Sequence, residues 1–228
     1  MRAAVWIVTA VLSLMPALAQ TAPATASSTA PQRIKGSIVG FAAPTLTVKT
    51  TKGETIALSL APNARVIATE KADFAALKPG DFIASTSSAG KDGRLLASEL
   101  RLFPEPLRGL GEGQYPSSDQ KSLINATVST ITPAAKGKGG SLKLTFHGSI
   151  PGPNGMCSGH APAPGQGPCA SDNEIVVGPK TMITRWVLGD TSWLEPGKAV
   201  SLFAVTDAGG KLSTYGVLVE HNGVKPLP

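Results

Sequence analysis

Two stretches of the chain follow one pattern, and this internal match constrains the fold more than any other feature of the sequence. Residues 58–102 align with residues 175–219 without a gap, at an offset of 117 positions. Only seven of the 45 aligned positions are identical, but most of the identities are turn or capping residues: Pro62/Pro179, Asp73/Asp190, Pro79-Gly80/Pro196-Gly197 and Gly93/Gly210. Turns and helix caps require these residue types because of their backbone geometry, so matches at such positions indicate a shared chain path. The match predicts two related units, and the alternative is convergence of two generic β patterns.

The upstream parts of the two units also correspond, after two insertions. "TLTVKT" at 45–50 matches "SLKLTF" at 141–146, and both place an apolar residue at every second position. A period of two predicts half-buried strands. Asp73 and Asp190 each precede a short helix-like piece and are the residue type that caps a helical turn. Each unit is therefore predicted to contain five or six short strands and one helical turn, curled into a small barrel that hides the strand edges.

The predicted fold class is all-β, with two tandem, related, OB-like barrels. The predicted organisation is a signal peptide (1–19), a linker (20–32), a first barrel (33–103), an inter-repeat linker (104–122) and a second barrel (123–222) with an inserted loop at 147–172.

The first residues, "MRAAVWIVTAVLSLMPALAQ", indicate export. One arginine precedes an apolar run that Pro16 interrupts, and "ALA" at 17–19 offers small residues for cleavage. The alternative is a membrane anchor, but the run is shorter than the roughly 20 residues that a span needs. We expect a periplasmic or secreted protein with no transmembrane anchor after processing.

The residues of the first unit also suggest a family. "GSIVGFAAPTLTVKTTKGETIALSL", "LKPGDFI" and "GRLLASELRL" together resemble a bacterial domain family of unknown function that occurs in exported proteins. The resemblance covers residues 33–103 and, more loosely, 123–220. It implies a small OB-like β-barrel and brings no activity and no site residues.

The two cysteines, Cys157 and Cys169, lie in the inserted loop, "PNGMCSGHAPAPGQGPCASDN". In an oxidising compartment two cysteines usually pair, so we expect a disulfide. The alternative is a copper or zinc site, because His147, Met156 and His160 add borderline and soft ligands to the two sulfur atoms. The spacing of these residues is not a standard zinc spacing.

Composition and motifs point away from catalysis and nucleic acid. The formal net charge is +6, but the lysines are scattered singly, and no row of aromatic residues accompanies them. The carboxylates are scattered too, and there is no Gly-x-Ser-x-Gly motif. We therefore expect no enzyme, no cofactor and no nucleic-acid partner.

The predicted function is that of a binding or scaffolding module of the bacterial cell envelope, acting on an unidentified envelope protein or surface. Recognition usually sits in loops on a rigid scaffold, which directs attention to the inserted loop and to residues 104–118. In the second segment Arg108, Glu112 and Tyr115 are expected to pack or pair between the two units. The alternative function is periplasmic metal binding by residues 147–169.

Overall fold

The computed structural model describes residues 30–92, 94–117, 121–135, 139–207 and 209–226. The predicted signal peptide (1–19) and residues 20–29 of the predicted linker lie outside the described residues. In the part of the chain that is described, no helix is both long and apolar enough to cross a membrane.

The fold is all-β, as predicted. The strands are β1 (Gln32–Ala42), β2 (Thr45–Thr50), β3 (Thr55–Lys71), β4 (Phe82–Ala89), β5 (Leu95–Leu102), β6 (Gly113–Pro116), β7 (Lys121–Pro133), β8 (Gly140–Gly148), β9 (Ile150–Pro151), β10 (Cys157–His160), β11 (Cys169–Gly189), β12 (Ala199–Thr206) and β13 (Leu212–Val219). Single 3-10 turns make up the helical structure: η1 (Phe74–Ala76), η2 (Glu105–Leu107), η3 (Pro153–Gly155) and η4 (Thr191–Trp193).

The two predicted caps are confirmed. A carboxylate oxygen of Asp73 accepts from the backbone N–H of Ala76 at 3.0 Å, at the start of η1. Asp190 accepts in the same way from the N–H of Ser192 at 2.8 Å, at the start of η4. The short side chain of aspartate satisfies a backbone donor that the first turn leaves free.

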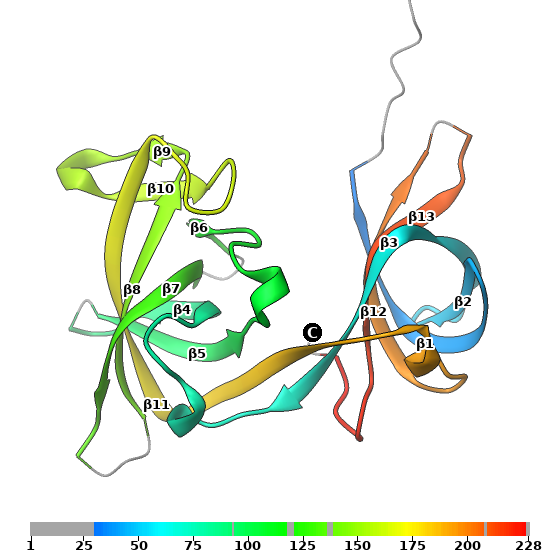
Figure 1. The fold of residues 1–228 in the computed structure, drawn as a ribbon, viewed down its shortest axis with the longest axis horizontal. Helices are drawn as coiled ribbons and strands as arrows, with labels where there is room; N and C mark the ends of the chain where they lie inside the picture. The colour runs from blue at the N-terminus through cyan, green and yellow to red at the C-terminus, as the bar shows by residue number, and fades with distance from the viewer. Residues whose placement is uncertain (1–29, 93, 118–120, 136–138, 208, 227–228) are drawn as a thin grey trace, which may run out of the picture.

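Five strands close on themselves to form the first barrel, on the right in Figure 1. In order they are β1, β2, β3, β13 and β12, and β12 returns to β1. Four of the neighbouring pairs are antiparallel, and β3 with β13 is parallel. The alternating apolar residues predicted for this unit point inward: Leu46 and Val48 are fully buried. We call this unit barrel 1.

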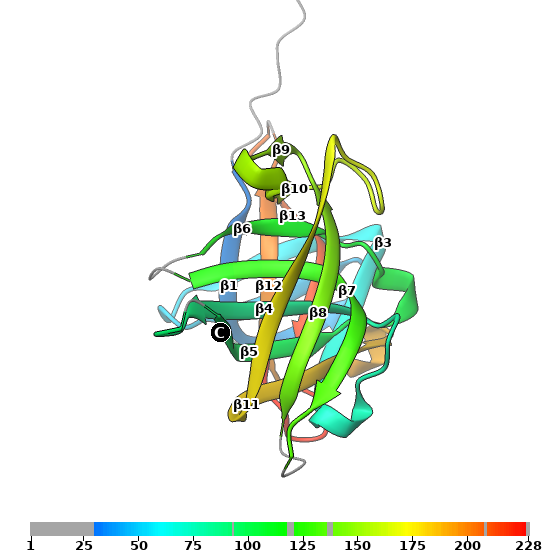
Figure 2. The same cartoon turned by 90° about the vertical axis from the view of Figure 1, so that its left-hand side faces the viewer.

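A second closed circuit, barrel 2, lies on the left in Figure 1 and faces the viewer in Figure 2. Its strands are β4, β5, β11, β8 and β7, and β7 returns to β4. Again one neighbouring pair, β5 with β11, is parallel. Leu142, Leu144 and Phe146 of β8 are fully buried in its core, as their alternation predicts.

The two circuits do not follow the expected boundaries, 33–103 and 123–222. The hairpin of β4 and β5 precedes residue 103 but pairs with β7 and β11 in barrel 2. The hairpin of β12 and β13 belongs to the second predicted unit but completes barrel 1. Each barrel therefore consists of three strands from one half of the chain and a hairpin from the other half.

The cause of this exchange is the length of β3 and β11, which are much longer than the short strands that the sequence predicts. They contain 17 and 21 residues. Each runs out of its own barrel, and their ends pair antiparallel where they cross, from Val66 with Gly189 to Lys71 with Thr184. Figure 1 shows this crossing as the link between the two barrels. Each of these strands reaches the other barrel before the chain turns back. The hairpin that follows it, β4–β5 after β3 and β12–β13 after β11, therefore joins the other barrel.

The two barrels repeat the same irregularity at corresponding places. In barrel 1 the pairing of β3 with β13 jumps from Leu60 to Arg65. In barrel 2 the pairing of β11 with β5 jumps from Val177 to Met182, at positions 117 residues later. The matched prolines Pro62 and Pro179 lie inside these jumps, where a residue without an N–H breaks no ladder hydrogen bond. The prolines of the sequence match therefore mark a shared interruption of the strand.

Candidate functional site

The two segments that the sequence singled out come together at one end of barrel 2. Strand β6, from the inter-repeat segment, pairs with β7 on one side and with β10, from the inserted loop, on the other. Strand β9 then pairs with β10. We call residues 104–117 and 148–169 together the cap. Figure 1 shows its strands at the end of barrel 2 that is remote from the β3–β11 crossing.

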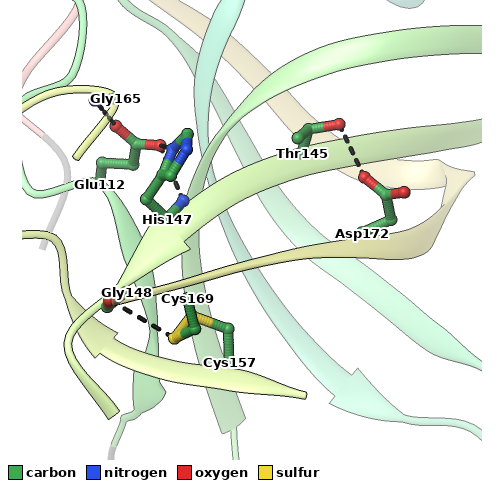
Figure 3. Close-up of polar contacts among 8 residues, drawn as sticks. All are labelled: Glu112, Thr145, His147, Gly148, Cys157, Gly165, Cys169 and Asp172. Carbon is green, nitrogen blue, oxygen red and sulfur yellow. Dashed lines mark hydrogen bonds and ion pairs between the residues drawn. A yellow bond between two sulfur atoms is a disulfide. The ribbon is translucent and has the colours of Figure 1, made fainter. Parts of the chain in front are cut away.

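Glu112 connects the two parts of the cap. Its side chain is only 8% exposed, and it accepts three hydrogen bonds. One carboxylate oxygen accepts from the backbone N–H of His147 at 2.8 Å and contacts Nδ1 of the same residue at 2.9 Å. The other oxygen accepts from the N–H of Gly165 at 2.7 Å. Figure 3 shows the carboxylate between these partners. Glu112 therefore ties the inter-repeat segment to β8 and to the inserted loop.

These contacts determine the charge state of Glu112. Burial by itself would raise the pKa of this carboxyl, but the hydrogen bonds from Gly165 and His147 outweigh burial and lower the pKa below its ordinary value of 4.5. An ionised Glu112 holds the proton of His147 on Nδ1, which leaves Nε2 as a hydrogen-bond acceptor in the neutral imidazole.

The glycines around Glu112 permit this approach. Gly109, Gly111 and Gly113 all have positive φ, at 78°, 63° and 134°. A Cβ on Gly109 would lie 2.2 Å from a side-chain atom of Pro164, and one on Gly113 would lie 2.1 Å from the carbonyl oxygen of Gly159. The alternating glycines therefore let the segment turn tightly and lie directly against the inserted loop.

The predicted disulfide between Cys157 and Cys169 is confirmed. It links β10 to the first residue of β11, and the half-cystine at 157 is buried in the core cluster of barrel 2. Closing so short a loop contributes about 3 kcal/mol in the chain-entropy model. The bond and Glu112 thus fix the inserted loop at separate points, as Figure 3 shows.

The residues of the metal alternative are placed separately. Nδ1 of His147 contacts Glu112, the ring of His160 packs against Tyr115 with centroids 4.0 Å apart, and Met156 is 48% exposed. Cys157 and Cys169 are bonded to each other, so neither supplies a thiolate. Among the described residues, no three His, Cys, Asp or Glu side chains are grouped so that they would hold a metal ion.

Arg108 and Tyr115 make their contacts inside the cap. Arg108 forms a two-point ion pair with Glu105, at 2.6 and 2.7 Å, within η2. Tyr115 packs on His160 of β10. These contacts are therefore not between the two units: Tyr115 and Glu112 contact the inserted loop, and Arg108 pairs within its own segment.

A pocket of about 380 Å³ opens beside Glu112. The side chains that give it polar character are Arg108, Glu112 and His147, and Phe82 and Pro164 lie in its wall. Thr145 also lines it and donates to Asp172 at 2.8 Å. The sequence marks Glu112 and His147 as separate candidates and does not connect them, because they are 35 positions apart and no motif links them. Gly165 and Thr145 gave no signal at all.

Comparison with known proteins finds no family model, no curated protein and no solved structure that matches the chain. The resemblance of residues 33–103 to a bacterial domain family therefore stays a prediction, and the function is argued from the geometry alone.

The lowered pKa of Glu112 predicts that acid loosens the cap. A carboxyl whose pKa is lower in the folded than in the unfolded chain stabilises the fold above its unfolded pKa, and this contribution is lost as the pH falls through the folded pKa. We expect the hydrogen-exchange protection of the His147 and Gly165 amides to fall from about pH 4.5 downward. Glu112→Gln keeps one accepting oxygen but has no carboxyl to titrate, so the protection of these two amides should be lower near neutral pH and should not fall further below about pH 4.5. Equal pH dependence in both proteins would contradict this assignment.

Proposed function

We propose that this chain is a non-enzymatic binding module of the bacterial cell envelope and that the cap is its recognition surface. The observation that carries the proposal is the joining of the two candidate loops into one surface by Glu112 and by the β6–β10 pairing, while the disulfide holds the inserted loop itself in place. Loops that are fixed before a partner arrives lose little conformational entropy on binding. A rigid barrel that displays such loops suits recognition.

The surface of the cap favours an apolar contact with a partner. Residues 148–171 contain no Asp, Glu, Lys or Arg. Two large apolar side chains, Ile150 and Met156, are 58% and 48% exposed. They belong to the same β9–β10 hairpin, in which Ile150 pairs with Ser158 and Pro151 pairs with Cys157, the residue after Met156. Exposed apolar side chains on this uncharged, inserted-loop part of the cap favour protein contact.

The proposal also covers the origin and export of the chain. We infer that the two halves arose by duplication of one unit, since the strand interruptions and the capping turns recur at the same offset. Five strands with one parallel closing pair support an OB-like description of each barrel.

The disulfide fits maturation in an oxidising compartment, and the start of the sequence supports export into the periplasm or medium.

Site-specific photo-crosslinking in the host envelope tests the cap. We expect a photoreactive residue in place of Ile150 or Met156 to give the same discrete adduct, because both positions would face the partner. Met182 is the matched control: it is 51% exposed and lies on β11, outside the cap. Adducts that form equally at positions 156 and 182, or none at either cap position, would contradict the proposal.

A further inference from the structure

The crossing between the two barrels contains a group of buried polar atoms that lack partners. Among the described residues, six buried side-chain nitrogen or oxygen atoms make no hydrogen bond, and four of them lie at this crossing. They are Oγ1 of Thr69, Oγ1 of Thr184, Nε of Arg101 and Nε1 of Trp186. An unpartnered buried polar group is costly, so a cluster of four calls for an explanation.

Strand register brings these four side chains together. Thr69 of β3 pairs directly with Trp186 of β11, and Thr184 of β11 pairs directly with Arg101 of β5. Thr184 and Trp186 are two residues apart on one strand, so they point to the same face. Directly paired residues also share a face, with Cβ atoms about 5 Å apart. The four atoms therefore belong to one patch on three adjacent strands, which we call the junction.

The chemistry of the junction is that of hydrogen-bond donors. The indole Nε1–H and the guanidinium Nε–H only donate, whereas the two threonine hydroxyls both donate and accept. A water molecule accepts about two hydrogen bonds, so one water would leave the remaining donors of this group without an acceptor. A carboxylate or phosphate group has several oxygen lone pairs and is able to accept from all four side chains.

The charge at the junction favours an anion. Arg101 forms an ion pair with Glu99 and lies 4.9 Å from the ring centroid of Trp186. Its guanidinium is largely buried, and burial, together with the positive charge of Arg33, lowers the pKa of Arg101 although Glu99 opposes the shift. Arg33 is itself placed over the ring of Phe203, at 5.7 Å. Because the positive charge of Arg33 acts directly on Arg101, an anion bound beside Arg101 would reduce the repulsion between the two guanidinium groups.

The junction also has an approach from solvent. Thr69 and Thr184 are 1% and 3% exposed, but the side chain of Arg101 is 20% exposed. The four unpartnered atoms themselves are shielded from solvent, so an oxyanion would reach the indole nitrogen and the two hydroxyls once the partly exposed side chain of Arg101 swings aside.

We propose that the junction is a binding site for an oxyanion, a carboxylate or phosphate group, held by Arg101, Trp186, Thr184 and Thr69. This site is separate from the cap and does not depend on the function proposed for it. Bound there, the anion would contact β3, β5 and β11 at once and so stiffen the connection between the two barrels.

Proton–nitrogen correlation spectra of the full chain provide the test. The indole N–H of Trp186 is the reporter, assigned with Trp186→Phe, and the indole of Trp193, stacked on His221 in barrel 1, is the internal reference. Titration with acetate, inorganic phosphate and sulfate distinguishes a carboxylate from a tetrahedral oxyanion site. We expect a saturable shift of the Trp186 signal with at least one of them, no shift of Trp193, and no response to chloride at equal ionic strength.

Matched threonine variants separate binding from packing. Thr184→Val removes an unpartnered hydroxyl, so it should raise the Tm in anion-free buffer and weaken anion binding at least tenfold. Thr69→Val should do the same. Thr214→Val is the control, because the hydroxyl of this fully buried residue bonds to the carbonyls of Phe203 and Gly216, and its loss should lower the Tm without changing anion affinity. A Trp186 signal that does not saturate, or unchanged affinity in both junction variants, would overturn the proposal.

Discussion

Residues 30–117 on their own are expected to fold only as a dimer. This fragment holds β1, β2 and β3 but lacks β12 and β13, which complete barrel 1. Six of the 13 buried residues in the core of barrel 1 come from the missing half: Leu194, Val200, Leu202, Ala204, Val217 and Val219. Five of them are large, and burying each contributes about 2 kcal/mol. The loss of about 10 kcal/mol is comparable with the whole stability of a typical domain, so the isolated monomer should be unfolded.

A second copy of the fragment supplies what the first lacks. The hairpin of β4 and β5 occupies in barrel 2 the place that β12 and β13 occupy in barrel 1. Two fragments are therefore able to exchange these hairpins, with their β3 strands crossing as β3 and β11 do here. Light scattering after size-exclusion chromatography, with circular dichroism, measures the outcome. A fragment that is both monomeric and folded would show that β4 and β5 close on their own half.

A complementary measurement uses the other half. Mixing residues 30–117 with residues 121–226 should restore the spectrum of the uncut chain, since every strand pair of both barrels is then available. Failure of the two fragments to associate under conditions in which the uncut chain is folded would contradict the hairpin exchange.

Replacing Glu112 by alanine should produce a larger loss of stability than removing either of the other two charged side chains of the cap, Glu105 and Arg108. The change leaves the N–H groups of His147 and Gly165 without their acceptor in a buried site. Hydrogen bonds to a charged group contribute about 1.5–3 kcal/mol each, less when the loops relax. We expect about 3 kcal/mol in total, which corresponds to a fall in Tm of about 6–12 °C for a chain of this size.

The conservative variant and a surface control identify the cause. Glu112→Gln keeps one accepting oxygen, so its loss of stability should be smaller than that of the alanine variant. Glu105→Gln removes the carboxylate that pairs with Arg108 on an exposed turn, 72% exposed at its side chain, and should leave the Tm unchanged within error. If Glu112→Ala and Glu105→Gln had equal effects, Glu112 would not be the anchor of the cap.

Local patterns in the sequence predicted the local structure well. The alternation in 45–50 and 141–146 identified β2 and β8, because a period of two has one structural solution when one face is buried. The capping role of Asp73 and Asp190 also followed from local chemistry, as did the disulfide from an expected oxidising compartment.

What the sequence did not reveal is non-local. The hairpin of β4 and β5 could complete a barrel with β1, β2 and β3 or with β7, β8 and β11. Both arrangements use the same residues, the same alternation and the same turns. The one available sign is the continuous strand character from Arg65 to Lys71, with no turn residue before Ala72, and a short strand inside one barrel has the same character. The pairing of Glu112 with His147 cannot be predicted from the sequence either, because these two residues meet only when the folded chain brings the inter-repeat segment against β8.

The hairpin exchange also determines when each barrel is able to form during synthesis. All five strands of barrel 2 lie between residues 82 and 189, so they are complete once the middle of the chain has emerged. Barrel 1 begins at residue 32 but needs a strand that ends at residue 219. Strands β1, β2 and β3 therefore remain incomplete until β12 and β13 have been made, and the two barrels form with barrel 2 first.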